Sequence, residues 1–204
     1  MNSLSLTLRT ASRGMMLLAL FAVAGTVGCH SSAPNLSEEE MMQVYQEAST
    51  KGEHHDRLAS FAGRWTTTTK MWSAPDTEPD ISQGTSTKTL TMDGRLLRED
   101  FNGSFAGSPF NGLGLTGYDN VSEEYHATWY DSWGTGVTRS VGHVDKMGNI
   151  AFDATYNDPI VDGPKTMQMK LIHHSEDKHV LEMHDTAPDG RRFQSLEIVY
   201  ERQQ

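Results

Sequence analysis

Apolar and polar residues alternate along most of the chain after residue 63, a period-two pattern that is typical of β-strands with one buried face. Short turn signals such as Asp93-Gly94 separate the alternating runs. The runs cover residues 64–72, 84–92, 95–104, 110–118, 124–131, 136–144, 149–156, 165–173, 179–185 and 192–202. Because a meander of this length removes its exposed edges by closing on itself, the pattern predicts an all-β fold, an antiparallel β-barrel of about ten strands.

The segment before the barrel has a helical period instead. Ser37 is a suitable N-cap, and Glu40 completes the capping-box pattern, so a helix is expected up to about residue 48. A second short helical piece over 56–62 leads into the first strand. The sequence thus predicts short N-terminal helices within 37–62, followed by a barrel domain over 63–204.

The apolar faces of two neighbouring runs, 165–173 and 179–185, predict how they pair. A shift by one residue would turn one apolar set away from the other, so the inward residues must lie directly opposite. The expected pairs are His173 with His179, Leu171 with Leu181, and Met169 with Met183. This register leaves residues 174–178 as the connection.

Residues 1–28 form a predicted targeting segment, with a basic beginning and a short apolar stretch over 15–27 that is typical of a secretory signal. Cys29, the only cysteine, follows directly. Residues 26–29 resemble the bacterial lipobox, in which the cysteine carries lipid and becomes the mature N-terminus. Thr26 departs from the aliphatic residue that is usual there. The alternative is an ordinary signal peptide, cut nearby, that leaves a free thiol.

The residues after Cys29 indicate the expected location. Residues 29–36 are small and polar, which is typical of a flexible tether. His30 stands where Asp usually retains lipoproteins at the inner membrane, so the start of the mature chain resembles that of outer-membrane lipoproteins. We therefore expect a lipoprotein of the bacterial cell envelope, anchored to the outer membrane and facing the periplasm.

Charge limits the partners of the protein. Without residues 1–28 the chain keeps 15 Lys and Arg against 27 Asp and Glu, a net charge of −12. This acidic balance argues against binding to nucleic acid or to anionic lipid head groups, so only the N-terminal lipid would hold the protein at a membrane. No cysteine follows Cys29, so the folded part must be stabilised by apolar burial and not by disulfides.

Several short motifs keep the order and spacing of a known family. They are Gly63-x-Trp65, Gly94-Arg95, Gly117-Tyr118-Asp119, Tyr125 and Trp129-x-Asp131-Ser132. Over roughly residues 55–200 the chain resembles the bacterial domain-of-unknown-function family numbered 1579. That family is similar to calycins, which include lipocalin-like and fatty-acid-binding-like barrels. The resemblance implies a calycin-like meander barrel with an N-terminal helical plug, and it implies no activity.

Two features raise the question of haem or metal binding. The helix followed by Gly63-x-Trp65 bears a remote likeness to nitrobindin, a haem-binding barrel, although the glycines that follow the Trp there are missing here. The expected register also places His173 and His179 together on the inward face, where neutral imidazoles could bind zinc or one could bind haem iron. The alternative is that these histidines are solvated residues at strand ends.

Barrels that hold a ligand place a few polar groups in a mostly apolar interior, so the inward residues are the binding candidates. We expect a small apolar or amphipathic ligand to contact Arg98, Tyr125, Trp129, Asp131, Met169 and Met183. The alternative is that the Asp and Arg side chains brace the barrel while the aromatic and methionine side chains fill its core.

No motif indicates an enzyme. Residues 112–117 match G-x-G-x-x-G, but a dinucleotide site needs a helix after this motif, and another strand follows here. The G-x-S-x-G motif of a serine nucleophile is also missing. The sequence therefore predicts a ligand-binding barrel of the cell envelope. A filled barrel that acts as a structural or interaction module is the alternative, and a haem- or metal-binding barrel is the third hypothesis.

Overall fold

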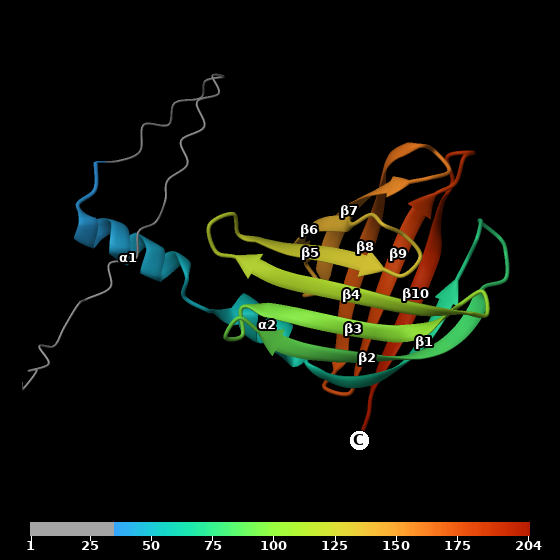
Figure 1. The fold of residues 1–204 in the computed structure, drawn as a ribbon, viewed down its shortest axis with the longest axis horizontal. Helices are drawn as coiled ribbons and strands as arrows, with labels where there is room; N and C mark the ends of the chain where they lie inside the picture. The colour runs from blue at the N-terminus through green and yellow to red at the C-terminus, as the bar shows by residue number, and fades with distance from the viewer. Residues whose placement is uncertain (1–34) are drawn as a thin grey trace, which may run out of the picture. The chain divides into compact units, whose positions relative to one another are not determined.

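The computed structural model describes residues 35–204, and the predictions for the targeting segment and for Cys29 lie outside these described residues. Ten antiparallel strands form one closed barrel, which confirms the predicted fold class (Figure 1). The strands are β1 (Gly63–Met71), β2 (Asp80–Thr91), β3 (Leu96–Phe105), β4 (Ser108–Asp119), β5 (Glu124–Asp131), β6 (Thr138–Val144), β7 (Ile150–Asp158), β8 (Gly163–Ser175), β9 (Lys178–Thr186) and β10 (Arg192–Arg202). Each strand pairs with the next one in the chain, and β1 pairs with β10 to close the ring.

Two helices precede the barrel, α1 (Glu38–Ala48) and α2 (Glu53–Ser60). The predicted capping box begins α1, since the backbone N–H of Ser37 donates to Glu40 Oε2 at 2.7 Å and the Ser37 hydroxyl accepts from the Glu40 N–H. The second helix begins three residues earlier than predicted. No helix within residues 35–204 has the length and apolar character that a membrane crossing requires.

The two helices differ in how they contact the barrel. Nothing in α1 is buried, and its large apolar side chains Met41, Met42, Val44 and Tyr45 are exposed. Its C-terminal end is held by the Asn120 side chain, which donates to the carbonyl oxygens of Ala48 and Thr50. By contrast, α2 contributes Leu58 to the core and leads to Phe61, and each of these side chains is 1% exposed.

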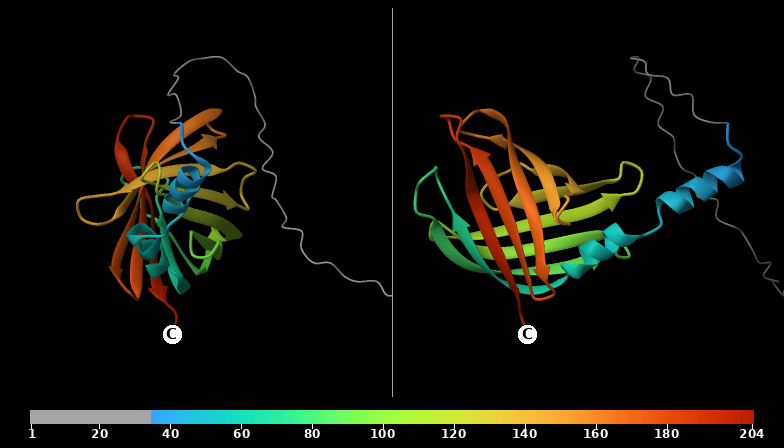
Figure 2. Two further views of the ribbon diagram at one scale, coloured as in Figure 1. Left: turned by 90° about the vertical axis from the view of Figure 1, so that its left-hand side faces the viewer. Right: turned by 180° about the vertical axis from the view of Figure 1, so that it is seen from behind.

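The core has two clusters inside the barrel. One includes α2 and the strands that it covers, with the buried residues Leu58, Phe61, Leu97, Tyr125, Ile150 and Phe152. The other is formed by Trp65, Phe101, Ile198 and Tyr200. Strands β2 to β5 cross β8 to β10 at a steep angle on the opposite wall, as Figures 1 and 2 show from several sides. The helix α2 therefore packs as the plug that the calycin resemblance implies.

The predicted pairing of β8 with β9 is confirmed. His173 lies opposite His179, Leu171 opposite Leu181, and Met169 opposite Met183. The predicted connection over 174–178 was too long, because β8 continues to Ser175 through a register shift and β9 already begins at Lys178. The inner faces of both strands are nevertheless assigned correctly.

Candidate functional site

The inner face of β5 carries three of the predicted binding residues. Tyr125, Trp129 and Asp131 share this face because side chains alternate along a strand. Tyr125 is 0% exposed in the core cluster that includes Leu58, and its hydroxyl lies 2.9 Å from His54 Nδ1. Burial raises the pKa of Tyr125 to about 12. Tyr125 therefore belongs to the packed end of the barrel and is not an accessible ligand contact.

Trp129 lies across two glycines of the neighbouring strand β4. A Cβ atom on Gly114 would lie 3.2 Å from the indole ring, and one on Gly112 would overlap it. The indole N–H donates to Asp131 Oδ2 at 3.2 Å. The G-x-G-x-x-G stretch thus lies within a strand, where its glycines make room for an aromatic ring.

Arg98 points away from the interior, so the prediction that it is an inward polar group was wrong. Its side chain is 49% exposed on the outer face of β3, and its guanidinium donates two hydrogen bonds to Asp100, of 2.8 and 2.7 Å. The alternation along β3 directs Leu97 and Glu99 inward instead. The inward charge on this strand is therefore Glu99, the next residue along the chain.

Met169 and Met183 face each other on the inner wall and are both partly buried. His173 is exposed, whereas His179 is 1% exposed, and its Nε2 lies 2.9 Å from Lys88 Nζ. A lysine amine at this distance engages the nitrogen that would bind a metal, and its positive charge repels a cation. The geometry therefore does not support zinc or haem binding by the two histidines. Residues 35–204 contain no cluster of three or more His, Cys, Asp or Glu placed to hold a metal ion.

A group of polar side chains inside the barrel was not predicted from the sequence. We call it the inner polar cluster, and it consists of Ser86, Lys88, Glu99, His179 and Tyr200. Lys88 Nζ lies 3.5 Å from Glu99 Oε2 and 3.9 Å from the centre of the Tyr200 ring. Ser86 donates its hydroxyl hydrogen bond to Glu99 Oε1 at 2.7 Å. The sequence signal that could have revealed this cluster was the alternation along β2, which places Ser86 and Lys88 on the inward face.

Burial governs protonation in the inner polar cluster. Desolvation lowers the pKa of Lys88, and the neighbouring Glu99 carboxylate only partly opposes this effect. Desolvation, with a smaller contribution from Lys88, lowers the pKa of His179 to about 2. Burial also raises the pKa of Tyr200 well above its usual range. His179 is therefore a neutral imidazole at neutral pH. Its Nε2 accepts a hydrogen bond from Lys88 and its Nδ1 carries the proton.

Two polar atoms in this part of the interior have no hydrogen-bond partner, Thr67 Oγ1 and His179 Nδ1. Their residues belong to one row across the inner face, because Thr67 lies opposite Tyr200 on the adjacent strand and Tyr200 lies opposite His179. An unpaired buried polar atom costs free energy, on the order of 1–3 kcal/mol.

Several apolar residues that face the interior are only partly buried. We call them the apolar wall, and they are Trp129, Met169, Leu181, Met183 and Leu196. The inward side chain of Glu99 is 18% exposed, so a water-sized probe reaches this part of the interior. The apolar wall and the inner polar cluster together provide the two kinds of surface that an amphipathic molecule needs.

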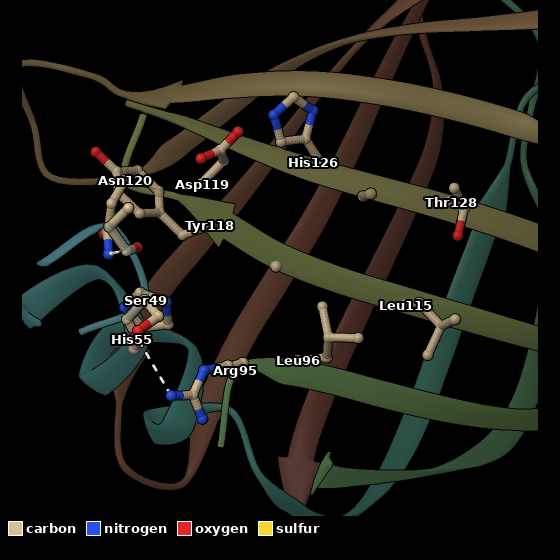
Figure 3. Close-up of a pocket in the computed structure, with 13 residues that line it drawn as sticks. Ser49, His55, Arg95, Leu96, Leu115, Tyr118, Asp119, Asn120, His126 and Thr128 are labelled. Atoms are coloured by element: carbon tan, nitrogen blue, oxygen red, sulfur yellow. Dashed lines mark hydrogen bonds between the residues drawn. The ribbon is translucent and has the colours of Figure 1, made fainter. Parts of the chain in front are cut away.

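A separate groove of about 390 Å³ lies on the outer wall of the barrel (Figure 3). Leu96 and Leu115 lie on its wall, and Ser49, at the C-terminal end of α1, lies on another side. Arg95 donates to the carbonyl oxygen of Ser49 at 3.1 Å and so connects the two sides. The groove is open to solvent, and no member of the inner polar cluster lines it.

A family description matches residues 50–202, "Protein of unknown function (DUF1579)". The chain belongs to the DUF1579 family. Among solved structures, the S-type phycobiliprotein lyase CPES from Guillardia theta is similar, with 10% identity, a TM-score of 0.50, and coverage of 78% of this chain and 97% of that one. A redesigned β-barrel has 18% identity and a TM-score of 0.38, with coverage of 72% of this chain and 95% of that one. These likenesses concern the fold alone. No curated protein matches the chain.

Several of the residues on which the resemblance to this family was based lie either in the interior or at the outer groove. Trp65, Trp129 and Asp131 belong to the interior, where Trp65 is 1% exposed and lies beneath the Arg202 guanidinium, 4.2 Å from its ring centre. Arg95 and the motif Gly117-Tyr118-Asp119 line the outer groove. The motifs on which the family resemblance was based thus include residues of the interior and of one outer surface.

Proposed function

We propose that this DUF1579 protein binds a small amphipathic molecule inside its barrel. The observation that carries the proposal is the apolar wall, whose inward residues are only partly buried beside the inner polar cluster. Removing apolar surface of a ligand from water contributes roughly 25 cal/mol per Å², and the polar cluster fixes the orientation of its head. The likeness to the phycobiliprotein lyase supports the barrel fold on which the proposal rests.

The binding test uses the neutral fluorescent probe N-phenyl-1-naphthylamine and two neighbouring residues of β5. Trp129 faces the interior, whereas Tyr130 is 48% exposed on the outer face. We expect the probe to bind, Trp129→Ala to weaken binding by about tenfold, and Tyr130→Ala to leave it unchanged. If the probe does not bind, or both variants weaken binding equally, the proposal fails and the filled-barrel alternative is favoured.

We also propose that Cys29 carries lipid and anchors the protein to the outer membrane, with the barrel facing the periplasm. The sequence pattern supports this proposal, since an apolar segment precedes the only cysteine and a small polar tether follows it. Growth with an alkyne-bearing fatty acid should label the wild-type protein and not Cys29→Ala. Recovery of the label in the inner-membrane fraction alone would contradict the outer-membrane location, and absence of label would contradict lipidation.

A further inference from the structure

One row of inward residues connects the buried lysine with the apolar wall. Lys88 lies opposite Glu99, Glu99 opposite Gly114, and Gly114 opposite Trp129, on four consecutive strands. The Lys88 side chain is 3% exposed, but that of Glu99 is 18% exposed although it faces inward. Because Gly114 has no side chain, little separates this ion pair from the apolar wall. A ligand on the apolar wall would therefore have its polar end beside Lys88 and Glu99.

The charges of the inner polar cluster select the chemistry of that polar end. Lys88 is already paired with Glu99, so a ligand carboxylate would meet one cation and one competing anion. A neutral carbonyl group avoids this repulsion. The geometry thus favours a ligand with a neutral carbonyl head.

We propose that Lys88 captures an aldehyde-bearing amphipathic ligand by forming a Schiff base with its carbonyl carbon. This inference rests on the proposed function and deepens it, since it names the chemical class of the ligand. The lysine is placed for such a reaction because its Nζ lies between a carboxylate at 3.5 Å and a neutral imidazole at 2.9 Å. Desolvation also increases the fraction of neutral, nucleophilic amine.

The reaction balances with the groups that are present. The Lys88 ammonium first gives a proton to Glu99, and the neutral amine then forms a C–N bond with the carbonyl carbon. A proton moves from nitrogen to the former carbonyl oxygen, which gives a carbinolamine. Glu99 returns its proton to the hydroxyl group, the C–O bond breaks, and water leaves. The product is a positively charged iminium, with the Glu99 carboxylate as its counter-ion and Ser86 holding the other carboxylate oxygen.

The chain contains a matched control for Lys88. Lys70 also forms an ion pair with a glutamate, since its Nζ lies 2.8 Å from Glu197 Oε1, but this pair is on the outer face and the lysine side chain is 39% exposed. The two lysines therefore differ in burial and not in having a carboxylate partner. If pairing with a carboxylate alone made a lysine reactive, Lys70 would react as well as Lys88.

The experiment uses decanal as the aldehyde and decanol as its unreactive analogue. The full mature protein is incubated with decanal near neutral pH, reduced with cyanoborohydride, and mapped by peptide mass spectrometry. We expect the decyl adduct on Lys88 to exceed that on Lys70, because desolvation lowers the pKa of Lys88 and so increases its fraction of neutral amine. Excess decanol should suppress the Lys88 adduct and leave surface adducts unchanged. This competition experiment uses the wild-type protein alone. The variants Lys88→Arg and Lys70→Arg, if they fold, provide a second comparison, in which each should lose only its own adduct.

Each outcome decides the inference. Preferential adducts on Lys88 that decanol suppresses support it. If decanol displaces N-phenyl-1-naphthylamine but Lys88 reacts no faster than Lys70, the Schiff base is excluded while the proposed function stands. If neither decanol nor decanal displaces a probe that binds, the aldehyde ligand class is overturned, and if the probe itself does not bind, the proposed function fails as well.

Discussion

Two ion pairs on opposite faces of β3 show how strongly the barrel wall separates environments. On the outer face, Arg98 donates two short hydrogen bonds to Asp100, and both side chains are nearly half exposed. On the inner face the next residue, Glu99, pairs with Lys88, whose side chain is 3% exposed. The outer pair has the better hydrogen-bond geometry. Breaking the inner pair should nevertheless cost more free energy of unfolding, because water screens the charges of the outer pair and the interior does not screen those of the inner one.

The inner pair also shows what a buried charge needs around it. Glu99 accepts from Ser86, and Lys88 is further contacted by His179 and by the face of the Tyr200 ring. These contacts compensate the loss of hydration that both charges suffer on burial.

The largest effect is expected for Lys88→Met, which keeps most of the side-chain volume but leaves Glu99 without its cation. Removing one partner of a buried ion pair typically lowers the free energy of unfolding by about 3–5 kcal/mol. Urea denaturation measures the change. A loss below about 1 kcal/mol would show that the inner pair is hydrated and screened like a surface pair.

Gly112→Ala should destabilise the barrel by about 1–3 kcal/mol, because the added methyl group would overlap the Trp129 ring. Gly136→Ala is the control, since a Cβ there meets no atom within 4 Å. Thermal unfolding of both variants checks the expectation. Equal effects of the two substitutions would mean that the indole ring does not lie over Gly112.

Stability should fall as the pH decreases below about 6.5. His179 stays neutral in the folded protein because its pKa is lowered to about 2, so below that pH the unfolded chain binds a proton that the folded one does not. One such proton contributes a slope of up to about 1.4 kcal/mol per pH unit. His179→Gln should remove this part of the slope in denaturation curves at several pH values. His55, whose pKa burial also lowers, contributes in the same direction in both proteins.

The smallest effect is expected for Arg98→Ala on the outer face. Exposed ion pairs contribute roughly 0–1 kcal/mol, so the free energy of unfolding should change by less than about 1 kcal/mol. Urea denaturation at low and high salt checks this, and the small difference from wild type should shrink further in high salt. A change as large as that of Lys88→Met would contradict the contrast between the two faces.

The sequence predicted the strands, the capping box of α1 and the pairing of β8 with β9 because these depend on local patterns of period, turn and cap. The inward face of β5 followed from the same alternation, and with it the positions of Trp129 and Asp131. Arg98 was misassigned because the adjacent Leu96 and Leu97 favour neither face of β3. The signal that places Glu99 inward was the alternation of Leu97 with Phe101. The inner polar cluster was not predicted because its members come from four strands, and only closure of the barrel brings Lys88 next to His179.

The most direct test of the account is nuclear magnetic resonance of protein labelled with ¹³C at its methionine methyl groups, titrated with decanol. Met169 and Met183 belong to the apolar wall, whereas Met92 and Met147 are 66% and 78% exposed and serve as internal controls. A ligand inside the barrel predicts shifts for the two wall methionines that saturate together, with the two exposed signals unchanged. Shifts confined to the exposed methionines, or no saturating shift in any signal, would contradict binding inside the barrel.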